Sequence, residues 1–277
     1  MDTTFLQDPS FMTLENQAFD AMQRIFPCEQ NLLDKIPLDK IIQHFQQDLI
    51  PQEHPFLIRV AGQSGSGKSS QVVPALESAL QGRDYLKLTV GAFAPFHPNY
   101  AEWQKNCPDQ MREKTNGFAL RALVMFYKHC ILTQVNLIFD MTLLEPEIDL
   151  YLMTLAKKMN YKIQAHILCV PRKISNLFIH LRQLKIGRIV KTSSSDYFFK
   201  ALAPCLKSLT HSGLFTSKDT LVLWSHFLMR PIRKTHLNNP SVMRLMARYH
   251  QCSFGLKDPK KLMAAKIKWM KCLLEKI

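Results

Sequence analysis

Apolar residues form two kinds of stretch along the chain. Short apolar runs bounded by polar or turn-forming positions predict buried strands at 56–61, 85–90, 136–140, 163–170 and 220–224. Between them, apolar residues recur at steps of three and four, which predicts helices at 70–80, 118–132 and 146–159. A loop is expected at 94–100, after the second strand. Strands that alternate with helices favour right-handed crossovers and a parallel sheet, with the ligand at the carboxyl ends of the strands. The fold class that we expect is therefore α/β.

Both ends of the chain lie outside this alternation. Residues 1–50 carry apolar positions at helical spacing, and a polar break at 51–54 precedes the first strand. The segment 257–276 is amphipathic and rich in lysine around Trp269. We therefore expect a helical N-terminal extension at 1–54, an α/β domain at 55–230 and a basic helical C-terminal extension at 231–277.

Composition narrows the class of protein and its partners. The 277 residues are 47% hydrophobic, which suffices for a full core, and the formal charge of +14 favours an anionic partner such as a nucleotide. The seven cysteines are scattered without a C-x-x-C pair, which favours reduced thiols and argues against a zinc site. No apolar run approaches the length of a membrane span, and the first ten residues do not resemble a signal segment. We expect a soluble, cytoplasmic protein.

One stretch carries a phosphate-binding motif. The sequence GQSGSGKS at Gly62–Ser69 matches the pattern G-x-x-x-x-G-K-[ST] without a mismatch, and it follows a predicted strand and precedes a predicted helix. That order is the context in which the motif binds a mononucleotide. The residues expected to line the nucleotide are Gly62, Gln63, Ser64, Gly65, Ser66, Gly67, Lys68, Ser69 and Ser70.

The residue types in this motif suit phosphate chemistry. Glycines let successive backbone N–H groups point at phosphate oxygens without an obstructing Cβ. Lys68 is expected to reach the β- and γ-phosphates, and the Ser69 hydroxyl to ligate Mg²⁺. A helix that begins near Lys68 adds the positive end of its dipole to the same anion.

An acidic residue ends the third predicted strand. Asp140 follows the apolar run Leu137-Ile138-Phe139, as an aspartate that holds Mg²⁺ beside a P-loop serine does. The alternative is an aspartate that caps the next helix or forms a turn, which is common after strands. With the P-loop upstream, we favour Ser69 and Asp140 as a metal pair.

A cluster of basic residues follows the fourth strand between 172 and 191, and it includes Arg182 and Arg188. Phosphoryl-transfer enzymes use such arginines to neutralise charge on the transferred group. A solvated helix face is the alternative, because charge runs usually belong to one.

These pieces together resemble the zeta toxin family of small P-loop kinases over residues 57–224. Besides the P-loop, the resemblance rests on Phe93 with His97-Pro98-Asn99-Tyr100, on the strand 136–140 followed by Thr142, on Val170-Pro171 and on 211–215. The resemblance implies a fold like that of nucleoside-monophosphate kinases. It also implies transfer of the ATP γ-phosphate to a hydroxyl of UDP-N-acetylglucosamine, and inhibition by an antitoxin protein.

The resemblance also implies a role for individual residues. Lys68 and Ser69 bind ATP and Mg²⁺, and Arg182 and Arg188 take the place of the family's lid arginines. Thr142 and His97 fall where the acceptor binds. The catalytic set that follows is Lys68, Asp140, Arg182 and Arg188.

Three positions depart from the family's pattern. Gly91 stands where the family has its catalytic aspartate, two residues before the aromatic that corresponds to Phe93. Leu144 replaces a substrate-side arginine, and the apolar residues around Val124 replace a substrate-binding glutamate. A positioned base contributes about 10²- to 10⁴-fold in rate, so its loss slows transfer without abolishing it. We expect weak or acceptor-shifted kinase activity, with Asp140 as the nearest candidate to act as base.

Two other functions stay open at this point. A nucleotide-binding pseudokinase that acts through a partner protein is consistent with Gly91 and Leu144. A basic nucleic-acid-binding P-loop protein is consistent with the lysine-rich segment 257–276, although a helix docked on the domain explains that segment more simply. The partners that we expect are ATP, a small-molecule acceptor and an antitoxin, and we do not expect nucleic acid.

Overall fold

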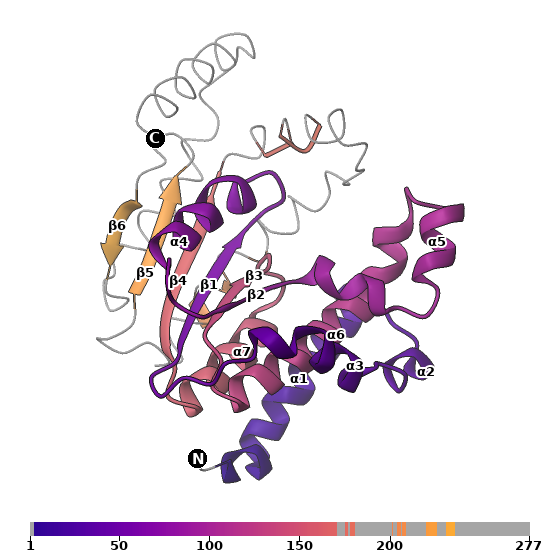
Figure 1. The fold of residues 1–277 in the computed structure, drawn as a ribbon, viewed down its shortest axis with the longest axis horizontal. Coiled ribbons are helices and arrows are strands. Elements are labelled where there is room, and N and C mark those ends of the chain that lie inside the picture. Colours follow the sequence, from indigo (N-terminus) through magenta and orange to yellow (C-terminus); the bar gives the residue numbers. More distant parts are fainter. Residues whose placement is uncertain are drawn as a thin grey trace. The chain divides into compact units, whose positions relative to one another are not determined.

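The computed structural model describes residues 3–170, the short pieces 175–176, 178–180, 201, 204–205 and 207–208, and two strands at 220–225 and 231–235. These residues all belong to one compact unit, Met1–Asn238 (Figure 1). The basic residues Arg182 and Arg188 and the segment 257–276 lie outside the described residues, so the predictions made for them remain predictions.

A single sheet forms the centre of this unit. Its strands are β1 (Phe56–Gly62), β2 (Leu86–Thr89), β3 (Leu137–Asp140), β4 (Lys162–Cys169), β5 (Thr220–Ser225) and β6 (Pro231–Thr235). They lie in the order β2-β3-β1-β4-β5-β6, and every neighbouring pair is parallel except β5–β6. The predicted parallel α/β sheet is therefore confirmed. The antiparallel strand β6 was not predicted.

Helices connect and flank the strands. The described α-helices are α1 (Pro9–Ile25), α2 (Gln30–Leu33), α3 (Leu38–Phe45), α4 (Val73–Ala79), α5 (Tyr100–Asn106), α6 (Met111–Leu132) and α7 (Pro146–Lys158). Short 3₁₀ or π segments are η1 (Thr4–Gln7), η2 (Gln46–Asp48), η3 (Lys68–Val72) and η4 (Val90–Phe96). Among the described residues, no helix combines the length and the apolar composition that a membrane span requires.

Two predicted boundaries were wrong. The loop expected at 94–100 begins instead as the 3₁₀ segment η4, and it is followed by the short helix α5. Helix α6 starts at Met111 rather than at 118, because its first turns are polar and exposed and therefore carry no apolar periodicity.

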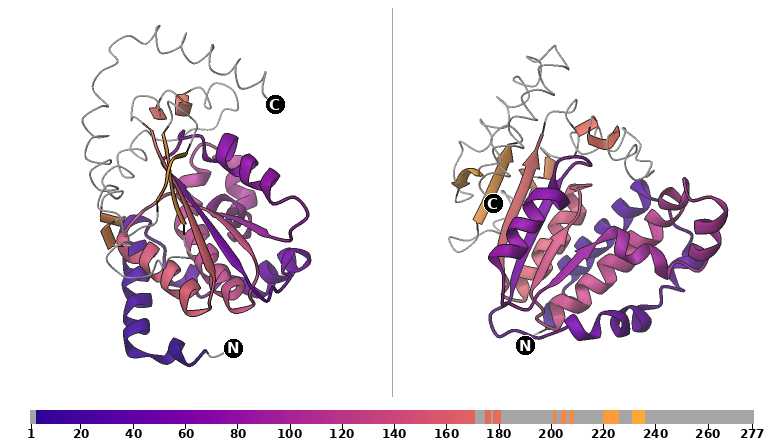
Figure 2. Two further views of the ribbon diagram at one scale, coloured as in Figure 1. Left: turned by 90° about the vertical axis from the view of Figure 1, so that its left-hand side faces the viewer. Right: turned by 45° about the horizontal axis from the view of Figure 1, so that its top comes forward.

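The sheet separates two apolar clusters. Leu57 of β1 belongs to the larger cluster, which is shared with α1, α3, α6 and α7. Its neighbours Ile58 and Val60 belong to a smaller cluster with Val72 and Val73 at the start of α4. This alternation follows from the two-residue period of a strand, which sends successive side chains to opposite faces. The twisted sheet and its two helical layers can be followed in Figure 2.

The N-terminal helices share the larger core. Glu15 of α1 accepts hydrogen bonds from Lys128 Nζ of α6 at 2.7 Å and from the Tyr151 hydroxyl of α7 at 2.6 Å. The ring centroid of Phe45, at the end of α3, lies 5.0 Å from the ring centroid of Phe126 and 5.8 Å from that of Phe93. The predicted N-terminal helices are thus confirmed, and they pack against α6 and α7.

A close approach between α6 and the end of α1 depends on a glycine. Arg121 of α6 is buried, and its Nη1 donates to the carbonyl oxygens of Phe26 and Gly117, both at 2.9 Å. Phe26 is the C-terminal cap of α1, where carbonyl groups lack helical partners and carry partial negative charge. A Cβ on Gly117 would lie 2.6 Å from the carbonyl oxygen of Pro27.

The substitution Gly117→Ala should therefore destabilise the fold. Alanine favours a helix interior by about 1 kcal/mol, but an added methyl group that displaces backbone costs about 1–3 kcal/mol. We expect a lower midpoint of thermal unfolding. Asn116→Ala, on the same turn of α6 and outside this contact, is the matched control and should leave the midpoint unchanged or raise it. An increase in the midpoint for Gly117→Ala would contradict the close approach.

Candidate functional site

The P-loop connects β1 to η3. Gly65 and Gly67 have φ angles of +74° and +95°, a backbone region that side chains with a Cβ rarely adopt. A Cβ on Gly65 would also collide with the carbonyl oxygen of Ser175. Helical structure begins at Lys68, as predicted, although its first turn is a π-helix over Lys68–Val72. Because the loop follows the last residue of β1, the loop and the amino end of the helical segment lie at the carboxyl edge of the sheet.

Lys68 folds back over the loop. Its Nζ donates to the carbonyl oxygen of Gly62 at 2.5 Å and to that of Gln63 at 3.2 Å. The ammonium group therefore lies against the backbone at the start of the loop, which is expected to bind phosphate oxygens. The hydroxyl oxygen of Ser66 is buried and has no hydrogen-bond partner among the described residues.

Asp140 lies beside the loop. In the parallel pairing of β1 with β3, Val60 is the register partner of Asp140, so both strands end at the same edge. The Ser69 hydroxyl donates to Asp140 Oδ2 at 3.3 Å. The structure thus brings together the two residues that were expected to hold a metal. Among the described residues, no group of three or more His, Cys, Asp or Glu side chains is arranged to hold a metal ion.

The two predicted acceptor residues lie in different surroundings. Thr142, just after β3, donates from Oγ1 to the carbonyl oxygen of Gly62 at 3.3 Å, so it lies beside the P-loop. His97 is 3% exposed, and its ring centroid lies 4.5 Å from that of Trp103 and 5.0 Å from that of Phe118. Its Nδ1 accepts a hydrogen bond from the backbone N–H of Asn99 at 3.0 Å, and burial lowers its pKa. These contacts serve local packing, and an acceptor role for His97 remains a prediction.

The positions that depart from the family differ in exposure. Gly91 lies in η4, two residues beyond Thr89, which is the register partner of Asp140 in β3. It is exposed, and a Cβ added there would meet no atom within 4 Å. Leu144 and Val124 are 8% and 1% exposed and belong to the main core cluster. A side chain could therefore be restored at 91 more readily than at 144.

Hydrogen bonds that the sequence did not reveal hold the loop from outside. Gln63 is buried, and its Nε2 donates to the carbonyl oxygen of Val170 at 2.6 Å, just beyond β4. The Ser175 hydroxyl donates to the carbonyl oxygen of Ser64 at 2.5 Å. Gln63 was expected to line the nucleotide, whereas its side chain ties the loop to the neighbouring strand. No local pattern signals such contacts, because their partners lie more than 100 positions away in the sequence.

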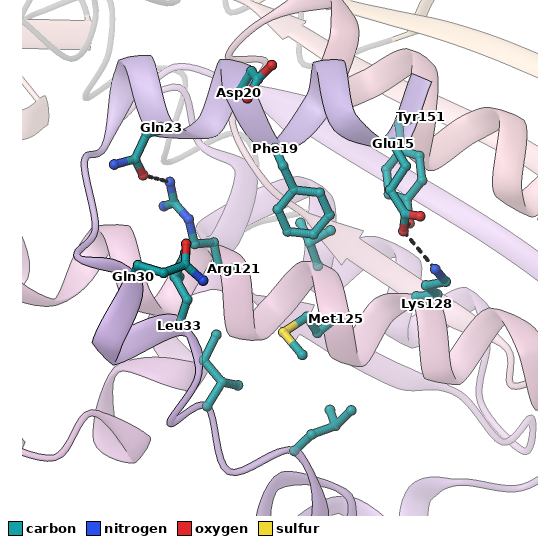
Figure 3. Close-up of a pocket in the computed structure, with 13 residues that line it drawn as sticks. Glu15, Phe19, Asp20, Gln23, Gln30, Leu33, Arg121, Met125, Lys128 and Tyr151 are labelled. Carbon is teal, nitrogen blue, oxygen red and sulfur yellow. Dashed lines mark hydrogen bonds and ion pairs between the residues drawn. The ribbon is translucent and has the colours of Figure 1, made fainter. Parts of the chain in front are cut away.

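A separate hollow of about 570 Å³ lies between α1, α2 and α6 (Figure 3). Figure 3 shows a polar group at each end of the hollow. At one end, Arg121 donates a hydrogen bond to Gln23. At the other end, Lys128 and the Tyr151 hydroxyl donate to the carboxylate of Glu15. These groups satisfy one another, and no residue of the P-loop lines the hollow. The candidate functional site is therefore the edge of the sheet around the P-loop.

The fold and the loop define an α/β protein of the P-loop kinase type. The family model for zeta toxin matches residues 41–225. The chain therefore belongs to the zeta toxin family, which confirms the resemblance inferred from the motifs. A search of curated proteins found no match to this sequence.

A solved structure shares the fold. It comes from the PezAT chromosomal toxin–antitoxin system of the human pathogen Streptococcus pneumoniae. It has a TM-score of 0.65 at 19% identity, over 90% of this chain and 98% of that chain. A complex of AvrRxo1-ORF1 and AvrRxo1-ORF2 with ATP has a TM-score of 0.44 at 15% identity, over 77% of this chain and 62% of that chain. Family and fold together support a nucleotide-dependent kinase in general.

Proposed function

We propose that this protein transfers the γ-phosphate of ATP to a hydroxyl group of a small acceptor, with a UDP-amino sugar such as UDP-N-acetylglucosamine as the leading candidate. The observation that carries the proposal is the complete loop Gly62–Ser69 at the end of β1, with the Ser69 hydroxyl 3.3 Å from the carboxylate of Asp140. Membership of the zeta toxin family supports the same reaction.

The oxygen donors at this edge fit Mg²⁺. A serine hydroxyl and one carboxylate are hard ligands, and Mg²⁺ completes its octahedral shell with water and phosphate oxygens. Bound there, Mg²⁺ would neutralise charge on the β- and γ-phosphates. We assign Ser69 and Asp140 to this ion.

The remaining roles follow from position and charge. Lys68 binds the phosphates, as its place above the loop carbonyls allows. Thr142 lies beside the loop and is the nearer of the two candidates for contact with the acceptor. Arg182 and Arg188 neutralise the transferred group. Asp140 is the register partner of Thr89, two residues before Gly91, and we assign it as the stand-in base. A carboxylate that holds a metal is a poor base, so transfer is slow.

We also propose an antitoxin protein as a partner and a cytoplasmic location. The partner is suggested by the zeta toxin family and by the likeness to a structure of a toxin–antitoxin system. The location is suggested by the scattered cysteines without a C-x-x-C pair. A nucleic-acid partner is the weaker alternative, since its main support is the lysine-rich segment 257–276.

A second candidate function is a nucleotide-binding pseudokinase that acts through a partner protein. Two observations favour it: Gly91 offers no base, and Leu144 is buried in the core instead of presenting a charge to an acceptor. Product formation separates the two functions. Incubation with γ-labelled ATP and a panel of UDP-sugars and nucleosides is the direct test.

Lys68→Ala should weaken ATP binding about 10- to 100-fold, because hydrogen bonds to charged groups contribute about 1.5–3 kcal/mol. Isothermal titration calorimetry measures the dissociation constants. Lys40→Ala, which removes an exposed lysine from α3, is the control of equal charge and should bind ATP as the wild type does. Equal ATP affinity for Lys68→Ala and the wild type would rule out the P-loop assignment.

Gly91→Asp should raise transfer to a UDP-sugar by about 10²- to 10⁴-fold, the usual contribution of a positioned base. The open space around this position accommodates the new side chain. Gly91→Asn has the same shape without a basic carboxylate and should stay at the wild-type rate. If Gly91→Asp is no faster than Gly91→Asn, the base lies elsewhere.

Alanine at Arg182 or Arg188 should reduce turnover by about 10³- to 10⁵-fold with little change in the ATP dissociation constant, because such arginines act on the transition state. Single-turnover transfer of label, measured beside calorimetric ATP binding, separates the two effects. Unchanged turnover in both variants would favour the alternative interpretation, in which these arginines belong to a solvated helix face.

A further inference from the structure

A charged residue lies in the middle of the apolar strand β1. Arg59 is 2% exposed, and its partner Asp149, in the first turn of α7, is 1% exposed. Nε and Nη2 of Arg59 donate to Asp149 Oδ1 at 3.2 and 2.9 Å, and the guanidinium lies 5.1 Å from the ring centroid of Phe139. Burial raises the pKa of Asp149, and the charge of Arg59 opposes this shift.

A buried ion pair of this kind needs an explanation beyond stability. Removing both charges from water is costly, and well-packed apolar residues often stabilise a core as much or more. The remaining donor, Nη1 of Arg59, contacts two backbone carbonyl oxygens, those of Val60 at 2.8 Å and Met141 at 2.5 Å. Asp149 therefore holds a guanidinium whose other side contacts the chain just past β3.

These contacts fix the segment that carries the candidate site. Met141 directly follows Asp140, and its backbone N–H donates to the carbonyl oxygen of Val60 at 3.2 Å. Both polar groups of the Met141 backbone are thus held against β1. On either side of Met141, Asp140 accepts from Ser69 and Thr142 donates to Gly62.

We propose that Arg59, oriented by Asp149, is a positioning residue that holds the backbone of Met141 and thereby aims the Asp140 carboxylate at the metal–phosphate position beside Ser69. This inference rests on the proposed function, since that assigns Asp140 to Mg²⁺. Groups that orient a metal ligand without touching the metal typically contribute about 10- to 100-fold in metal affinity or activity.

The test measures the gain in ATP affinity that Mg²⁺ provides, as the ratio of calorimetric dissociation constants without and with the ion. The double variant Arg59→Met/Asp149→Leu replaces the pair with apolar side chains, so the core stays filled while the Met141 carbonyl loses its donor. We expect near-wild-type thermal stability and unchanged ATP affinity without Mg²⁺, because the loop itself is intact. The Mg²⁺-dependent gain should fall about 10-fold or more.

Two further variants keep the test decisive. If the double variant does not fold, Arg59→Lys replaces it, because one ammonium group cannot span Asp149 and both carbonyl oxygens. Tyr127→Phe is the control for the loss of a buried hydrogen bond to α7, the helix that carries Asp149. The Tyr127 hydroxyl donates to the carbonyl oxygen of Leu152 at 2.9 Å. This variant should reduce thermal stability and leave the Mg²⁺-dependent gain unchanged.

Asp140→Asn separates failure of this inference from failure of the proposed function. We expect Asp140→Asn to lose the Mg²⁺-dependent gain, and the Arg59 variants to add no further loss in that background. If Asp140→Asn keeps the full gain, the metal assignment is wrong and the inference fails with it. If Asp140→Asn loses the gain while the Arg59 variants keep it, Arg59 has a purely structural role and the inference alone is overturned.

Discussion

The parallel pairing of β1 with β3 is the constraint on which the site depends. It makes Val60 and Asp140 register partners, so the P-loop that follows β1 and the acid that ends β3 meet at one edge. The two site residues, Ser69 and Asp140, are 71 positions apart in the sequence. Strand β1 has β3 on one side and β4 on the other, so the chain connections leave β1 in opposite directions along the sheet. Open α/β sheets bind ligands at such a switch point, outside the carboxyl ends of the strands.

Buried polar contacts hold this edge in place from several directions. Gln63 ties the loop to the end of β4, Ser175 donates to Ser64, and Arg59 holds the backbone beyond Asp140. Each contact costs desolvation and adds little net stability. Their common effect is to place donors and acceptors before a ligand arrives, and this preorganisation is the main protein contribution to phosphoryl transfer.

The helices before residue 41 lie outside the part of the chain that matches the family model, yet they are integral to the same core. Helix α1 is joined to α6 and α7 through the carboxylate of Glu15, and Arg121 caps its end. The cap works because Gly117 allows the backbone of 26–28 to approach α6 closely. This layer packs against α6 and α7.

The sequence by itself determined the parts of this protein that depend on local patterns. The five parallel strands, the P-loop, the helical start at Lys68 and the family were all predictable, because periodicity, glycine and lysine spacing act over a few residues. Strand β6 and segment η4 with helix α5 were not predictable, since β6 pairs with β5 and η4 packs against α6. The early start of α6 was not predictable either, because its first turns are polar and exposed and show no apolar periodicity. The sequence also paired Asp140 with Ser69, from an acid at the end of a strand with a P-loop upstream, and in the structure the Ser69 hydroxyl lies 3.3 Å from the Asp140 carboxylate. Only the tertiary structure decided that the Gln63 side chain turns to Val170 and that Arg59 contacts Met141. These two contacts join residues 82 or more positions apart, and no local pattern encodes the burial that brings them together.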